Sequence, residues 1–309
     1  MKNPPGPPFF DACAAGTAAC RKRPAGFVVY YVEFFLKSHE ISLANWEKFL
    51  YNSTKLWYRG RCRLGEVVAV LSGKGGTGKT SVCAGIASAL AESGLRVLAI
   101  DCDVGLRNLD ISLGMTDTPA LSFLDVMRGD YSLEEAARHP MYERLYFLTA
   151  PMNCPAEQID RAGFAAMLEE ARRKFDAILL DAPAGLDSGF LLTAVSADRH
   201  LLVTGAGPAA VRDAARVGDV LELMGKRNVR MIVNRVSREM LSTVRVTIDD
   251  VMDTAGVPLL GVVLEDPSVT LAASFGRPLL YYARRGPAAQ GCRRIARRLQ
   301  GLYEPITLK

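Results

Sequence analysis

The sequence predicts an α/β domain built on a single doubly wound, mostly parallel sheet with helices on both faces. Three observations indicate this fold. Short apolar runs alternate with helical patterns from residue 64 onward, a glycine-rich turn follows the first run, and two later runs end in an aspartate. The chain of 309 residues, with 49% apolar and 23% charged residues, is long enough and apolar enough for one large core.

The expected elements follow from the spacing of the apolar residues. Predicted strands are short β-rich runs bounded by turn residues, at 66–71, 96–101, 145–149, 177–181, 200–204, 230–234 and 259–263. Predicted helices lie at 82–91, 121–127, 133–137, 156–175, 209–224, 246–254 and 288–302. Because strands and helices alternate, the strands should run parallel, and ligands should bind at their carboxyl ends.

The glycine-rich turn, SGKGGTGKTS at residues 72–81, joins the first strand to the first helix. Its spacing satisfies the P-loop pattern, in which Lys79 contacts the β- and γ-phosphates and Thr80 contacts Mg²⁺. Free backbone N–H groups and the helix dipole both favour phosphate at such a turn. A plain glycine-rich connection is the alternative. The residues expected to bind the cofactor here are Gly73, Lys74, Gly75, Gly76, Thr77, Gly78, Lys79, Thr80 and Ser81.

Three aspartates follow predicted strands. Asp101 and Asp103 come at the end of the second strand, and Asp181 ends the fourth. A parallel sheet brings these ends to the edge where the P-loop lies, and carboxylates there can hold Mg²⁺ or orient an attacking water. Each aspartate taken alone could also be a helix cap or a turn residue.

The P-loop contains a second lysine, Lys74, directly after its first glycine, so that it reads KGGTGKT. This form resembles the deviant Walker A box of the MinD/ParA/Mrp/nitrogenase-iron-protein superfamily. The resemblance implies a homodimer with ATP sandwiched between the subunits, in which Lys74 reaches the partner's nucleotide. Lys74, Lys79 and Asp103 are then the expected catalytic residues.

Two further stretches narrow the resemblance to the MinD family, whose ATPases position bacterial division by recruiting a septum inhibitor to the membrane. IDCDVGLRNLD at 100–110 resembles that family's switch I, and LLDAPAG at 179–185 resembles its switch II. By this resemblance, Asp103 positions the hydrolytic water. Thr80, Asp101 and Asp181 act on the Mg²⁺ shell.

The same resemblance assigns the remaining cofactor contacts. It places Asn108 near the partner's nucleotide and makes Asn234, in MIVNRV, the residue that reads adenine, because an amide offers both a donor and an acceptor to the base edge. Asp266 and Pro267, in LEDPSV, match the loop near the base. Asn234 as a mere turn residue is the alternative.

The expected function is that of a dimerising switch ATPase that hydrolyses ATP with Mg²⁺ in the placement of the division site, with a MinC-like inhibitor or another regulator as its partner. A ParA-type partition ATPase on nucleoid DNA is the alternative, but the DPQ sequence usual in that group is absent. Flagellar-number and cargo-positioning ATPases are also considered, although the former usually lack the arginine of GLRN. A metallochaperone or a small-molecule ligase on the same fold is a further alternative, but the sequence shows neither a metal-binding cysteine pair nor a substrate pocket, and its cysteines do not match nitrogenase-type relatives.

Residues 1–63 differ from the rest of the chain. They hold 10 Lys and Arg against 4 Asp and Glu, whereas residues 64–309 hold 28 against 29, so global charge gives no argument for DNA binding. We expect 1–63 to be a mistranslated leader, with translation starting at Leu64. A real extension that packs on the domain or lies on a membrane through the aromatic stretch 27–36 is the alternative. The expected ATPase domain spans 64–303, followed by a short tail at 304–309.

The last predicted helix, 288–302, places small apolar residues on one face and four arginines elsewhere. Docking on the sheet with solvated arginines is the favoured interpretation, and contact with anionic lipid is the alternative. The C-terminal targeting helix usual in the resembling family is not evident, and no apolar run approaches the roughly 20 residues that span a bilayer. We therefore expect a cytoplasmic protein and leave peripheral contact with the inner face of the membrane open.

Overall fold

The computed structural model describes residues 65–152, 154–237 and 248–306. These residues belong to one compact unit. The predicted segment 1–63, with both of its interpretations, lies outside the described residues. So do Leu64 and residues 307–309 of the predicted tail.

An eight-stranded sheet forms the centre of the domain, in the order β3-β4-β2-β5-β1-β6-β7-β8. Every neighbouring pair runs parallel except β3 and β4 at one edge. This confirms the predicted doubly wound, mostly parallel sheet. The strands are β1 (Glu66–Leu71), β2 (Val97–Asp101), β3 (Ala137–Arg138), β4 (Leu145–Leu148), β5 (Ala177–Asp181), β6 (Arg199–Gly205), β7 (Val229–Val236) and β8 (Leu259–Leu264).

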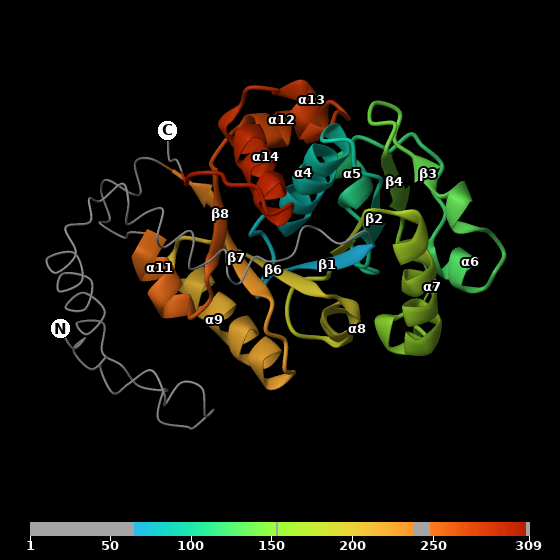
Figure 1. Ribbon diagram of the computed structural model, residues 1–309, viewed down its shortest axis with the longest axis horizontal. Helices are drawn as coiled ribbons and strands as arrows, with labels where there is room; N and C mark the ends of the chain where they lie inside the picture. Colours follow the sequence, from blue (N-terminus) through green and yellow to red (C-terminus); the bar gives the residue numbers. More distant parts are fainter. Residues whose placement is uncertain (1–64, 153, 238–247, 307–309) are drawn as a thin grey trace, which may run out of the picture. The chain divides into compact units, whose positions relative to one another are not determined.

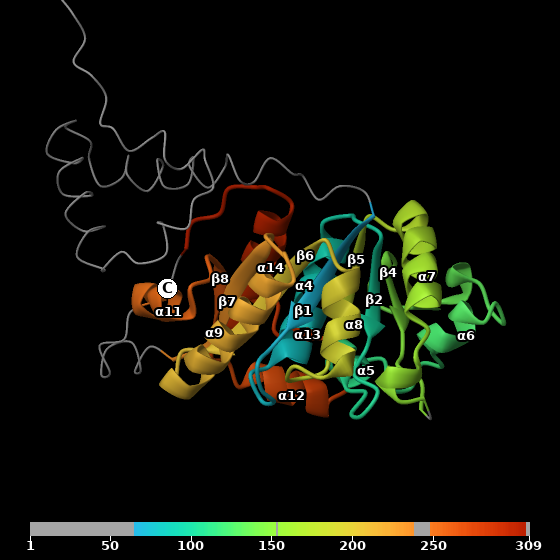
Figure 2. The same cartoon turned by 90° about the horizontal axis from the view of Figure 1, so that it is seen from below.

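Helices cover both faces of the sheet (Figure 1). One face carries α4, α5, α12, α13 and α14, and the other carries α7, α8, α9 and α11, as a second view also shows (Figure 2). The central strands β1, β2 and β5 are therefore buried on both sides, and their sequences are continuous apolar runs. The α-helices are α4 (Lys79–Glu92), α5 (Leu109–Leu113), α6 (Phe123–Met127), α7 (Arg161–Lys174), α8 (Ser188–Ser196), α9 (Pro208–Leu223), α11 (Ile248–Ala255), α12 (Ser268–Ser274), α13 (Leu279–Tyr282) and α14 (Pro287–Leu299).

Two predicted helices differ from the structure. The predicted helix 156–175 is wrong in its first turn, which is the 3₁₀ segment η3 (Ala156–Gln158), because the Asp160 side chain accepts from the amides of Ala162 and Gly163 and starts α7 there. The predicted helix 133–137 is only the 3₁₀ turn η2 (Leu133–Glu135), which precedes β3. The helices α5, α8, α12 and α13 were not predicted; α8 is apolar almost all round and so lacks the amphipathic period.

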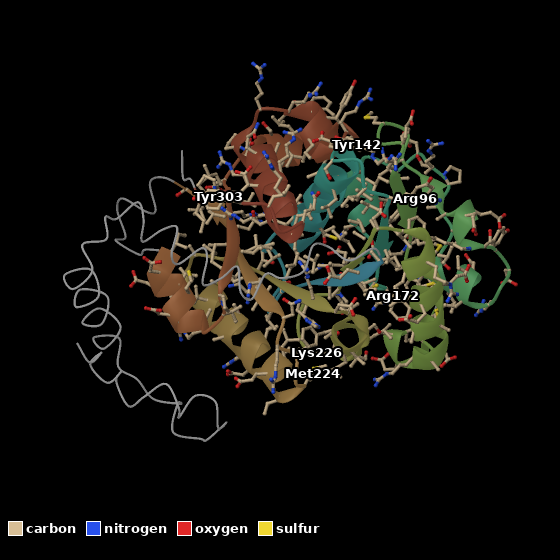
Figure 3. The ribbon with its side chains drawn as sticks, in the orientation of Figure 1. Arg96, Tyr142, Arg172, Met224, Lys226 and Tyr303 are labelled. Atoms are coloured by element: carbon tan, nitrogen blue, oxygen red, sulfur yellow. The ribbon has the colours of Figure 1, made fainter. Side chains whose placement is uncertain are left out.

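Arg172 links several elements at the amino-terminal edge of the sheet. Arg172 of α7 donates to the Asp198 carboxylate and to the carbonyl of Gly65, at the start of β1 (Figure 3). Asp198 also accepts from the amide of Val67 at 2.8 Å. These charge-assisted bonds hold β1, α7 and the start of β6 together, and the opposite, carboxyl edge carries the predicted site residues.

The last helix, α14, docks as the favoured interpretation predicts. Ala288, Cys292, Ile295 and Leu299 are buried on one face of it. The expectation that the arginines of this helix are solvated is wrong for Arg298, which is buried and donates to the carbonyl oxygens of Leu260 and Glu304. Across the described residues, every helix is too short or too polar to cross a bilayer.

Candidate functional site

The predicted P-loop forms a phosphate cradle between β1 and α4. The helix begins at Lys79, and its N-cap, Gly78, provides no side-chain bond to the first turn. The amides of that turn therefore remain available to a ligand. The Thr77 hydroxyl in the same loop is buried and has no hydrogen-bond partner, as expected for a group that awaits a ligand.

Two glycines are required where the loop meets its neighbours. Gly78 has a φ of 82°, and a Cβ on it would lie 2.3 Å from Nδ2 of Asn234. A Cβ on Gly73 would lie 2.6 Å from the carbonyl oxygen of Asp213 in α9. Any side chain at these positions would move the loop, so the glycines fix its path.

A buried ion pair lies beneath the cradle. Nζ of Lys79 donates to Oδ1 of Asp181 at 2.7 Å, and the two side chains are only 6% and 1% exposed. Burial by itself would lower the pKa of Lys79, but the charge and the hydrogen bond of Asp181 raise it above its usual value. Lys79 is therefore a fixed cation at the phosphate cradle. Thr80 lies beside it, with its hydroxyl 3.4 Å from Nζ.

The two strand-end aspartates stand side by side. Asp101 of β2 is the register partner of Asp181 of β5, which confirms that the parallel sheet brings them to one edge. Burial and the charge of Asp181 raise the pKa of Asp101 to about 7. Its two carboxylate oxygens accept from the amides of Asp103 and Leu109, at 2.9 and 3.1 Å. Asp101 therefore anchors both ends of the 102–109 loop.

The 102–109 loop carries the predicted Asp103 and Asn108. Within the described residues, neither side chain forms a hydrogen bond with the P-loop. Oδ1 of Asp103 accepts from the amides of Gly105 and Leu106, each at 3.2 Å, within its own loop. Asn108 is exposed just before α5. Arg107, at a φ of 47°, donates to the Thr149 hydroxyl after β4. In this arrangement the loop bonds to Thr149, just after β4, a contact that the sequence analysis missed.

Lys74 differs sharply from Lys79. Its side chain is 43% exposed, and its Nζ lies 3.9 Å from Oδ2 of Asp213 in α9. An exposed pair at that distance contributes about 0–1 kcal/mol, so Lys74 is held only loosely. Of the two P-loop lysines, Lys79 is therefore buried beside the phosphate cradle, whereas the Lys74 side chain is exposed and can extend toward a neighbouring molecule.

A pocket of about 310 Å³ opens beside the cradle. Asn234 lines it and donates from Nδ2 to the carbonyl oxygen of Thr77 at 2.7 Å, so the predicted base-reading residue is joined directly to the P-loop. Asp266 accepts from the amides of Ser268 and Ala288 and lines the pocket beside Pro267. The sequence analysis missed ten lining residues. Some directly neighbour predicted site residues, and others, such as Leu279 and Cys292, come from elements later in the chain. The ten are Val82, Arg235, Val263, Leu264, Glu265, Val269, Thr270, Leu279, Ala288 and Cys292.

The site fits Mg²⁺ only together with a phosphate ligand. No group of three or more His, Cys, Asp or Glu side chains within the described ranges could hold a metal ion by itself. Mg²⁺ in proteins commonly takes one or two protein ligands and completes its shell with phosphate oxygens and water. Thr80, Asp101 and Asp181, clustered at the cradle, suit that kind of site.

Comparisons with known proteins agree with this geometry. The family profile described as the CobQ/CobB/MinD/ParA nucleotide binding domain matches residues 68–279. A putative septum site-determining protein MinD from Nephroselmis olivacea is 37% identical over 243 residues, covering 78% of this chain and 89% of the relative. The septum site-determining protein MinD of Synechocystis is 33% identical over 245 residues, covering 79% and 92%.

Solved structures show the same relationship. MinD in the MinC:MinD cell division protein complex of Aquifex aeolicus aligns with a TM-score of 0.72 at 35% identity, covering 78% of this chain and 98% of that one. MinD of Pyrococcus horikoshii, complexed with Mg-ADP, aligns with a TM-score of 0.66 at 31% identity, covering 76% and 95%. The chain therefore belongs to the CobQ/CobB/MinD/ParA nucleotide-binding family and, within it, to the MinD group.

Proposed function

We propose that this protein is a MinD-like, Mg²⁺-dependent ATPase that dimerises on ATP and acts in the placement of the division site. Family membership supports this, as do relatives that are named septum site-determining proteins. The observation that carries the proposal is the pair of P-loop lysines, Lys79 buried on Asp181 and Lys74 exposed. Only the second can act on another subunit without breaking the core.

Lys79 and the free amides at the start of α4 bind and orient the phosphates. Thr80 would offer its hydroxyl to Mg²⁺, and Asp101 and Asp181 would help to hold that ion beside the phosphates. When bound, Mg²⁺ neutralises charge that develops on the phosphates. Asn234, Asp266 and Pro267 hold the base, as expected for the pocket they line.

Asp103 orients the attacking water in this proposal. Its Oδ2 makes no hydrogen bond within the described residues, because both loop amides bond to Oδ1. A carboxylate oxygen that accepts no other bond can accept one from a water molecule.

Lys74 and Asn108 act across the dimer, because both are exposed at the edge that holds the nucleotide. The ATP dimer then creates the surface for a protein partner, and hydrolysis releases it. A MinC-like partner is favoured by the MinC:MinD complex of Aquifex aeolicus. We place the protein in the cytoplasm, because ATP is its substrate.

Light scattering and ATP turnover test the proposal together. Asp103→Ala should bind ATP with Mg²⁺, stop turnover and accumulate as a dimer, whereas Lys74→Ala should bind ATP and remain monomeric. Lys226→Ala, in the loop after α9 (Figure 3), is the matched lysine control, and Asp117→Ala, exposed after α5, is the matched aspartate control. Turnover of Asp103→Ala at the parental rate would remove Asp103 from the mechanism. An ATP-dependent dimer of Lys74→Ala would remove the cross-dimer role of Lys74.

A further inference from the structure

Thr149 contacts the 102–109 loop from a fixed position at the edge of the sheet. It is the first residue after β4, and β4 pairs in parallel with β2 up to Leu148 and Ile100 (Figure 1). Thr149 and Asp101 are therefore the next residues at the carboxyl ends of two neighbouring strands. Thr149 thus lies beside the strand end that anchors the loop, on the edge that carries the phosphate cradle.

The backbone of Thr149 is bonded through both of its polar groups. Its amide donates to the carbonyl oxygen of Leu121 at 2.9 Å, and its carbonyl oxygen accepts from the amide of Phe123 at 3.0 Å. Phe123 is fully buried and packs edge-on against Phe164, with ring centroids 5.4 Å apart. Thr149 itself is only 7% exposed. Because close-packed neighbours hold this residue, its hydroxyl has a rigid base.

The Thr149 hydroxyl accepts two hydrogen bonds from one side chain. Nε and Nη2 of Arg107 donate to Oγ1 at 3.2 and 2.9 Å. Hydrogen bonds from a charged guanidinium are stronger than those between neutral groups. Because both donors converge on one atom, they fix the direction of the guanidinium as well as its distance.

Arg107 has a backbone conformation that needs such support. Its φ is 47°, in the left-handed region that is unfavourable for a residue with a Cβ. Such a conformation persists where the surrounding structure holds it. Among the described residues, Thr149 is the only side chain to which Arg107 bonds. The hydroxyl is therefore the side-chain contact that can hold Arg107 in this conformation.

The conformation of Arg107 in turn shapes the turn that carries Asp103. The amide of Arg107 donates to the carbonyl oxygen of Asp103 at 3.1 Å. Oδ1 of Asp103 accepts from the amides of Gly105 and Leu106 inside the same turn. Both residues at the tip are exposed, Leu106 by 71%, so the core does not hold the tip in place. These bonds connect Arg107 to the direction in which the Asp103 carboxylate points.

We propose that Thr149 is a positioning residue for ATP hydrolysis. Its hydroxyl holds Arg107, Arg107 holds the turn at 103–107, and the turn directs Oδ2 of Asp103 toward the attacking water. This inference rests on the proposed function, which assigns that water to Asp103. Thr149 is not among the residues that line the nucleotide pocket, so it acts on turnover rather than on binding.

A bond that only stabilised the fold would behave differently. Its loss would lower the free energy of unfolding and leave turnover by the folded protein unchanged. Loss of a positioning bond lowers kcat and leaves KM, because a misplacement of about 1 Å can cost about 100-fold in rate while ground-state binding persists. Urea unfolding, kcat and KM measured on the same variants therefore separate the two roles.

Steady-state ATP turnover by the full chain with Mg²⁺ tests the proposal. Thr149→Val replaces the hydroxyl by a methyl group and should lower kcat about 10- to 100-fold, with KM for ATP within about twofold of the parent. Thr149→Ser retains the hydroxyl and should restore most of kcat. Thr193→Val is the matched control, because the buried Thr193 hydroxyl bonds to carbonyl oxygens of its own helix α8. The control should turn over ATP as the parent does.

Arg107→Gly breaks the same contact from the other side. Glycine adopts a φ of 47° without steric cost, so this variant should keep its fold while it loses both bonds to Thr149. Its kcat should fall as in Thr149→Val. The double variant should be no slower than the slower single variant, because both changes remove the same pair of bonds. Losses that multiply would show that the two residues act separately and would contradict the proposal.

Hydrogen exchange follows the loop without any ATP turnover. Amides in peptides that cover residues 102–109 should exchange faster in Thr149→Val than in the parent, because the turn is less firmly held. Peptides that cover α4 should exchange at the parental rate. Faster exchange of the loop together with the parental kcat would make the bond a purely structural one.

Two further results would overturn the positioning role. Thr149→Val could turn over ATP at the parental rate, or Thr149→Ser could be as slow as Thr149→Val, which would remove the hydroxyl from the argument. Failure of the proposed function gives a different result. In that case the parent does not hydrolyse ATP, or Asp103→Ala matches the parent, and the positioning role fails with it. An active parent, an inactive Asp103→Ala and a fully active Thr149→Val would refute the role of Thr149 alone.

Discussion

The buried pair of Lys79 and Asp181 gives a prediction that separates folding from nucleotide binding. Lys79→Ala should abolish ATP binding, but it should also destabilise the free protein, because it leaves Asp181 buried and unpaired. The pair is 2.7 Å long, with side chains 6% and 1% exposed. Loss of ATP binding by this variant is therefore informative only if its stability without nucleotide is known.

The magnitude follows from the cost of leaving one buried charge without its partner. Breaking a buried pair from one side costs about 3–5 kcal/mol, whereas replacing both partners by apolar residues is often neutral or stabilising. A loss of 3–5 kcal/mol is a large share of the roughly 5–15 kcal/mol that stabilises a typical domain. Lys79→Met combined with Asp181→Leu should therefore recover most of the stability that Lys79→Ala loses and still bind no ATP.

Urea unfolding without nucleotide at pH 7.5 measures the unfolding free energy of the parent, of Lys79→Ala and of the double variant. Calorimetric titration with ATP and Mg²⁺ measures nucleotide binding by each of them. The expected order of unfolding free energy places the double variant close to the parent and Lys79→Ala well below both. If Lys79→Ala unfolds within about 1 kcal/mol of the parent, the buried pair does not carry the energy assigned to it. Binding of ATP by the double variant would contradict the phosphate role of Lys79.

The remaining predictions concern buried contacts elsewhere in the domain. His139 is buried. Its Nε2 donates to the carbonyl oxygen of Leu113, and its Nδ1 accepts from the amides of Met141 and Tyr142, so these bonds require the neutral ring. Burial lowers the pKa of His139 below the usual 6.5. The unfolded chain then binds the extra proton, so unfolding free energy should fall as the pH drops below 6.5, by up to about 1.4 kcal/mol per pH unit for this group. His139→Gln should show a shallower slope in urea unfolding between pH 7.5 and 5.5, and an unchanged slope would refute the assignment. Gly85→Ala should cost about 1–3 kcal/mol by overpacking, because its Cβ would lie 2.5 Å from Sγ of Cys292 where α4 meets α14. Cys292→Ala in the same chain should return part of that loss in thermal unfolding, and additive losses would contradict the proposed clash.

Local pattern was enough to predict seven of the eight strands, but it missed the two-residue edge strand β3 (Ala137–Arg138), which overlaps the helix predicted over 133–137, and it did not predict every helix. The strands are short, apolar and bounded by turns, so their period and composition survive in the sequence, and β5 (Ala177–Asp181) was predicted at both ends. The helix predicted over 156–175 fails at Asp160, where a capping bond decides the boundary. Helices of four to nine residues, such as α8 and α13, are too short or too uniformly apolar for a helical period to appear.

For this protein the sequence by itself determined the parallel sheet, the phosphate cradle at residues 72–81 and the strand-end aspartates, because each depends on residues that are close together in the chain. Tertiary structure alone decided which lysine pairs with Asp181, how Asp101 anchors the 102–109 loop and that Cys292 lines the pocket. It also showed that α14 engages most of its own arginines. These contacts join residues that are far apart in the sequence. They therefore produce no periodic or local sequence pattern from which they could be predicted.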